Sequence, residues 1–143
     1  MADPLTTARE AGFTVIGHEG TAEEAWAVWR MFIADSAVPT LRVPDDDPDP
    51  RAVEAAWVHI TAATGLFDTS GEFLLSVGGE GTSRLPWIRV RTAPDAQILA
   101  LGLTYGVPEF VATSIDRSVA IGVTSEEDET WILVADDRPT GAP

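Results

Sequence analysis

The stretch EFVATSIDRSVAIGVTSEEDETWILVAD, residues 109–136, carries the clearest pattern in the chain. Three runs rich in Val, Ile and aromatic residues, at 109–115, 118–125 and 130–136, are separated by turn-like segments. The segment 115–118 leaves room only for a tight turn. Short apolar runs with this spacing are typical of antiparallel strands joined by hairpins. This part of the sequence therefore predicts a β-meander.

Three more runs of the same kind lie upstream, at 71–79, 86–92 and 96–104. Segments rich in Gly, Pro and Asp separate them, so each run has the length of a strand rather than that of a helix. A further short strand is compatible with residues 13–18. We therefore expect an antiparallel sheet of about five or six strands.

The N-terminal half has the periodicity of helices instead. Thr21 and Glu24 form a capping box, and the apolar residues that follow have the spacing of one helical face. They predict a helix at about 22–35. A second apolar stripe predicts a helix at about 50–64, and Gly65 is well placed to end it.

Trp57 and either Trp26 or Trp29 lie on these stripes and are expected to pack the helices onto the sheet. The predicted fold class is α+β, with two helices packed on one face of an antiparallel meander. The length is that of one domain. Its expected parts are a helical half to about residue 65, a β-rich half at 66–137 and a short tail at 138–143.

Charge is the strongest signal in the composition. The chain has 143 residues, of which 9 are Lys or Arg and 23 are Asp or Glu, giving a formal net charge of −14. Such a charge repels nucleic acids and anionic membrane surfaces and attracts basic partners. We therefore expect a basic protein partner, no nucleic acid and no membrane.

Several site classes are excluded by what the sequence lacks. The chain has no Cys, which excludes disulfides, thiolate metal sites and a cysteine nucleophile. The glycine-rich stretch at 78–83 is no phosphate loop, because the chain has no Lys. We expect no cofactor and no metal. The start MADPLTTARE lacks the features of a signal peptide, so the expected location is the cytoplasm.

Two acidic runs are the first candidate contacts for a partner. One lies in the Pro-rich segment 38–50, which predicts a loop, and 39–48 is expected to be its least ordered part. This run lacks the Gly and the spacing of a calcium loop, so a solvated loop is the simpler interpretation. The second run is expected at a hairpin tip, where a solubilising turn is the simpler interpretation and an acidic prong for a basic partner is the alternative. The candidate residues are Asp45, Asp46, Asp47, Asp49, Glu126, Glu127 and Asp128.

A local basic cluster adds three candidates. On a strand, Trp87, Arg89 and Arg91 share one face. A Trp beside two Arg can stack on a planar group of a partner or hold a carboxylate or phosphate. The alternative interpretation is that the arginines pair with the chain's own carboxylates.

Three functions are compatible with these patterns. The first is a small acidic protein-binding module, a bacterial inhibitor or immunity-type protein that occupies a basic surface of a partner. The second is a small enzyme, a cyclase, isomerase or hydrolase with an apolar pocket, although no nucleophile motif is present. Its candidate residues are His18, Asp68, Arg89 and Asp116. The third is an accessory subunit of an assembly or secretion system.

Overall fold

The structure is a computed structural model that describes residues 3–136, so the expected tail at 138–143 lies outside the described residues. Within them, three α-helices and two short 3-10 helices accompany one seven-stranded antiparallel sheet. In chain order the elements are α1 (Pro4–Glu10), β1 (Thr14–Glu19), α2 (Ala22–Ile33), β2 (Leu41–Pro44), α3 (Ala52–Thr64), β3 (Glu72–Val77), η1 (Thr82–Arg84), β4 (Trp87–Arg91), η2 (Ile98–Ala100), β5 (Phe110–Thr113), β6 (Val119–Ser125) and β7 (Glu129–Asp136).

The strands lie in the order β1-β4-β3-β5-β6-β7-β2. The predicted α+β class and the antiparallel pairing are therefore confirmed. The meander holds for β5, β6 and β7, whereas the connection from β4 to β5 carries the chain past β3. Strands β1 and β2, from the N-terminal half, form the two edges of the sheet. They raise the number of strands above the expected five or six.

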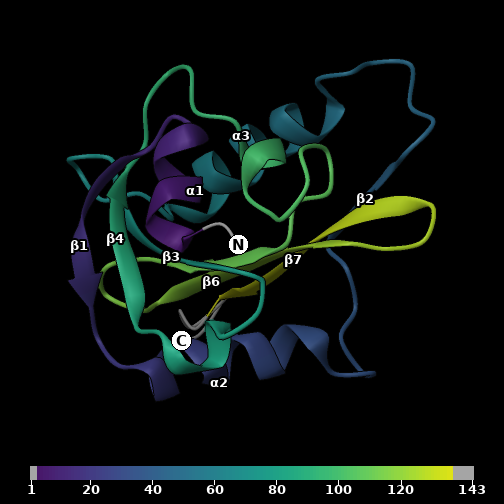
Figure 1. The fold of residues 1–143 in the computed structure, drawn as a ribbon. Coiled ribbons are helices and arrows are strands. Elements are labelled where there is room, and N and C mark those ends of the chain that lie inside the picture. Colours follow the sequence, from purple (N-terminus) through teal and green to yellow (C-terminus); the bar gives the residue numbers. More distant parts are fainter. Residues whose placement is uncertain (1–2, 137–143) are drawn as a thin grey trace, which may run out of the picture.

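Helices cover both faces of this sheet (Figure 1). Helices α1 and α3 pack with one buried cluster that includes Phe73 and Leu75, and α2 packs with another that includes Leu74. All six residues of β3 are buried, so each face of the strand needs a cover. The prediction that both helices lie on one face is therefore wrong: α2 and α3 lie on opposite faces.

The predicted helix ends are close to the observed ones. The side chain of Thr21 accepts the backbone N–H of Glu24 at 3.1 Å, which is one half of the capping box, whereas the Glu24 carboxylate pairs with Arg117. Gly65 ends α3 with a φ of 72°, a conformation that glycine adopts without strain. Helix α3 begins slightly later than expected, because the carboxylate of Asp49 first accepts the N–H of Arg51 in a turn.

Two segments differ from their predicted structure. Part of the expected loop at 38–50 is β2, an edge strand whose Val43 is buried; Pro44 is tolerated there because an edge strand leaves backbone groups unpaired. The run 96–104 is no strand and contains η2 instead. The carboxylate of Glu54 on α3 accepts the N–H groups of Ile98 and Leu99 at 3.0 and 2.9 Å, which fixes this turn.

Tryptophans anchor the helices on both faces, as expected for Trp29 and Trp57. Trp57 is 5% exposed, and its ring centroid lies 5.4 Å from that of Phe110 in an edge-to-face contact. On the opposite face, Nε1 of Trp29 donates to the hydroxyl of Ser76 at 2.8 Å. Helices α2 and α3 are thus each anchored by a buried Trp, and α2 also buries Phe32.

Replacing Trp57 with Ala is expected to lower the free energy of unfolding by about 3–5 kcal/mol, because it removes a buried aromatic residue and leaves a cavity. Chemical denaturation measures the loss. The matched control is Val58→Ala on the same helix, where the side chain is 64% exposed, and a change within about 0.5 kcal/mol is expected. A loss below about 1 kcal/mol for Trp57→Ala would contradict the packing described.

Candidate functional site

Two acidic turns that lie far apart in the sequence meet at one end of the sheet. Strand β2 pairs with β7 so that Pro44 lies opposite Glu129. Directly beyond this pair, the N–H of Asp45 donates to the carbonyl oxygen of Asp128 at 2.9 Å. The β6–β7 hairpin extends past the helices on the right of Figure 1. We call the six acids of the two turns the acidic protrusion: Asp45, Asp46, Asp47, Glu126, Glu127 and Asp128.

Backbone hydrogen bonds build both turns and leave the carboxylates outside. The N–H of Glu126 donates to the carbonyl oxygen of Glu129 at 2.8 Å, and that of Asp47 donates to the carbonyl oxygen of Pro44 at 3.1 Å. The carboxylate of Asp47 then accepts the N–H of Asp49 at 2.8 Å, which leads the chain toward α3. All six acids are exposed. The protrusion therefore combines a hydrogen-bonded backbone with solvent-facing charge, and the low order expected at 39–48 stays a prediction.

Little positive charge offsets the protrusion. Within residues 3–136, none of its six carboxylates forms an ion pair. Arg42 lies over the ring of Trp131 with its Nε 4.0 Å from Glu129. Burial raises the pKa of Glu109 at the base of the protrusion, and the charge of Glu126 raises it further. The same described residues contain no group of three or more acids or histidines that could hold a metal ion.

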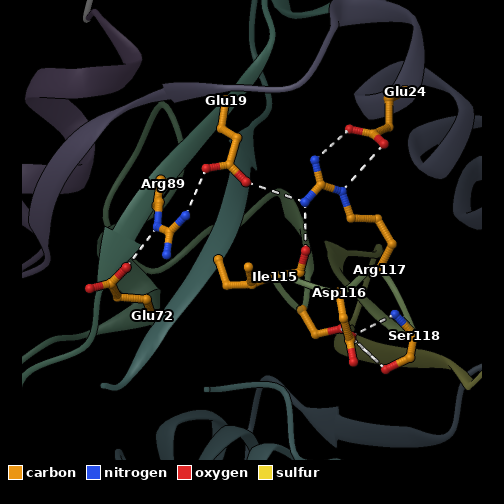
Figure 2. Close-up of polar contacts among 9 residues, drawn as sticks. Glu19, Glu24, Glu72, Arg89, Ile115, Asp116, Arg117 and Ser118 are labelled. Carbon is orange, nitrogen blue, oxygen red and sulfur yellow. Dashed lines mark hydrogen bonds and ion pairs between the residues drawn. The ribbon is translucent and has the colours of Figure 1, made fainter. Parts of the chain in front are cut away.

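A second charged cluster lies on the α2 side of the sheet, where arginines and glutamates alternate (Figure 2). Their N···O distances run from 2.7 to 3.3 Å. The side chains come from β1, β3, β4, the first turn of α2 and the β5–β6 turn, so the chain of ion pairs joins five segments. In order it contains Arg91, Glu72, Arg89, Glu19, Arg117 and Glu24.

Arg117 enters this chain from an unusual backbone conformation. Its φ of 63° is uncommon for a residue other than glycine. The turn is held by Asp116, whose carboxylate accepts the N–H of Ser118 at 3.0 Å and the hydroxyls of Ser114 and Ser118 at 2.7 Å. These hydrogen bonds lower the pKa of Asp116 to about 2. The turn thus directs the guanidinium toward Glu24, as Figure 2 shows.

Trp87, Arg89 and Arg91 share one face, as predicted, but they are not equally accessible. Trp87 is fully buried, and its Nε1 is the buried side-chain polar atom that lacks a hydrogen-bond partner within residues 3–136. Arg89 donates to Glu19 and Glu72, and Arg91 donates to Glu72. This arrangement matches the alternative interpretation, in which the arginines pair with the chain's own carboxylates. Trp87 is not positioned to stack on a partner at the surface.

The four residues considered for an enzyme do not converge. His18 is exposed on β1, and Arg89 belongs to the chain of ion pairs. Asp68 and Asp116 do line the same hollow, of about 290 Å³. Their carboxylates, however, accept backbone N–H groups, those of Ser70 and Ser118 among them. Both aspartates therefore have a direct role in forming turns.

Comparisons of the chain with protein-family models, with curated proteins and with solved structures give no match. Within residues 3–136, no helix has the length and apolar character to cross a membrane. The chain of ion pairs is internally neutralised, whereas the acidic protrusion is not.

The chain of ion pairs makes stability depend on pH. Hydrogen bonds from Arg89 lower the pKa of Glu19, and those from Arg91 and then Arg89 lower the pKa of Glu72, both from the usual 4.5. A carboxyl group whose pKa is lower in the folded than in the unfolded state stabilises the folded state when the pH is above the unfolded-state pKa. That stabilisation is lost as the pH falls through the folded-state pKa. Glu109 has the opposite effect on the pH dependence of stability, because its pKa is raised in the folded state.

We expect the free energy of unfolding of Glu72→Gln to differ most from that of the wild type above about pH 5 and to approach it at lower pH. Denaturation followed over a series of pH values measures this difference. The control is Glu80→Gln, an exposed position without an ion pair among the described residues, which should keep the wild-type profile. A difference between wild type and Glu72→Gln that stays constant with pH would exclude the ionic contribution.

Proposed function

We propose that this protein is a small acidic protein-binding module, of inhibitor or immunity type, whose acidic protrusion occupies a basic surface of a partner protein. The observation that carries the proposal is the convergence of two acidic turns, one after β2 and one between β6 and β7, at one end of the sheet. An ordered backbone presents six exposed carboxylates there without an ion pair among residues 3–136.

The distribution of arginines supports the proposal. Of the 9 basic residues, Arg89, Arg91 and Arg117 are paired with glutamates of the chain itself. Their charge is neutralised locally by these glutamates, and none of the three pairs with a carboxylate of the protrusion. The positive charge of these three arginines therefore holds the fold together, and the negative charge of the protrusion is left to act outside.

Such a surface acts mainly on association. A cluster of like charges creates a potential that attracts and orients a partner of opposite charge, which raises the association rate. Exposed charges are screened by salt, so the effect is largest at low ionic strength. Ordered turns hold the carboxylates in place before the encounter, and less conformational entropy is lost on binding.

Neutralising the β2 side of the protrusion is expected to slow association with the partner about tenfold at low salt and to flatten its salt dependence. Dissociation is expected to change less. Asn preserves the side-chain oxygen with which Asp47 accepts its backbone hydrogen bond. The partner is first captured with the wild-type chain from the native host, and rates are then measured against ionic strength. The variant carries Asp45→Asn, Asp46→Asn and Asp47→Asn.

A control variant removes three negative charges elsewhere, at exposed positions that form no ion pair within the described residues. It carries Glu10→Gln, Asp35→Asn and Glu80→Gln. Its association rate should stay within about twofold of the wild-type rate. The proposal fails if the captured partner presents an acidic surface, or if both variants slow association equally, since net charge and not the protrusion would then be responsible.

A further inference from the structure

A large hollow lies beside the acidic turn that precedes α3. It has a volume of about 650 Å³ and runs between α3 and the segment 92–105. Its lining includes Phe13, Trp57 and Phe67; Phe13 and Trp57 are only 4% and 5% exposed, so their rings belong mainly to the core beneath the hollow. Pro50 also lines it, and the acidic protrusion and the groove are thus separated by only a few residues of chain. We call this hollow the α3 groove.

The far wall of the α3 groove is fixed in place before any partner binds. Glu54 on α3 holds the N–H groups of Ile98 and Leu99. The N–H of Gln97 donates to the carbonyl oxygen of Ala11 at 2.8 Å, and that of Gly106 donates to the carbonyl oxygen of Leu99 at 2.9 Å. The groove is therefore preformed, which lowers the entropic cost of filling it.

Large apolar side chains remain exposed around this groove. Val58 on α3 and Tyr105 on the opposite wall both line it, and they are 64% and 65% exposed. Leu103 and Val107, in the same loop as Tyr105, are 73% and 48% exposed but do not line the groove; Leu103 lines a smaller hollow beside α1. Single exposed apolar residues are ordinary, but Val58 and Tyr105 line one groove, and an apolar anchor of a partner can be buried between them.

The charge around the groove selects the kind of partner. Glu54 and Asp95 line it together with one cation, Arg51, and Asp49 and the β2 side of the acidic protrusion follow directly along the chain. A second copy of this chain would bring its own net charge of −14 to the same place and be repelled. A segment with positive charge is attracted instead.

We infer that the α3 groove binds a segment of the partner protein in which a large apolar side chain is flanked by arginine or lysine. The apolar side chain enters between Val58 and Tyr105, and the flanking cations face Asp95 and the acidic protrusion. This inference rests on the proposed function in taking the partner to be basic. It adds an apolar anchor, which burial stabilises, to a surface that otherwise acts through charge.

Short synthetic peptides test the inference without the natural partner. The main probe carries a Trp flanked by arginines; in one comparison peptide Ser replaces the Trp, and in another Glu replaces each Arg. Affinity and backbone amide shifts are measured by NMR with the wild-type chain, with Val58→Arg, and with the control Val38→Arg. Val38 is 77% exposed and lies outside the groove lining, so the control adds the same charge elsewhere.

The Arg-flanked Trp peptide is expected to shift the amide signals of Val58 and Tyr105. Val58→Arg should weaken the affinity for this peptide at least tenfold, about 1.4 kcal/mol. Val38→Arg should leave the affinity within about twofold of the wild-type value. Both comparison peptides should bind far more weakly.

If the Ser peptide binds equally well, or if Val58→Arg leaves the affinity unchanged, the α3 groove does not bind an apolar anchor. The proposed function is left standing in that case. Binding of the Glu-flanked peptide as tightly as the Arg-flanked one overturns the basic chemistry of the partner. Absence of binding by the Arg-flanked peptide also overturns the inference, whereas the proposed function is judged separately by the captured partner.

Discussion

The burial of β3 on both faces is the constraint on which the rest of the structure depends. Phe73 and Leu75 point toward α1 and α3, while Leu74 and Ser76 point toward α2. A strand buried in this way cannot lie in a sheet covered on one side only, because exposing either set of side chains would return apolar area to water. The position of α2, opposite α3, follows from this requirement.

Two-sided burial also requires partners for the polar residues of β3. Glu72 is 8% exposed, and a carboxylate so placed is tolerated because Arg89 and Arg91 both donate to it. Arg89 in turn needs Glu19, and Glu19 is shared with Arg117. The alternating chain of ion pairs is thus the polar counterpart of the apolar core, and the uncommon backbone conformation of Arg117 is one consequence of completing it.

Local patterns predicted the elements better than their arrangement. The capping box at Thr21, the glycine end at Gly65 and five of the six predicted strand runs in the β-rich half follow from residues near one another in the sequence. The side of the sheet that each helix covers does not, although one signal was present: FLL in β3 and the continuous apolar runs of β6 and β7 lack the polar alternation of a half-exposed strand. Edge strand β2 and the meeting of Asp45 with Asp128 depend on pairing distant segments, which local sequence does not determine.

The clustering of the acidic turns favours the proposed binding surface over a device for solubility. Like charges in neighbouring turns repel one another, and no ion pair within residues 3–136 neutralises these carboxylates. Solubility needs only net charge, which the remaining acids already supply, and dispersed carboxylates would provide it without that repulsion. Carboxylates placed together beside a preformed groove instead favour the proposed partner, which brings both cations and an apolar anchor.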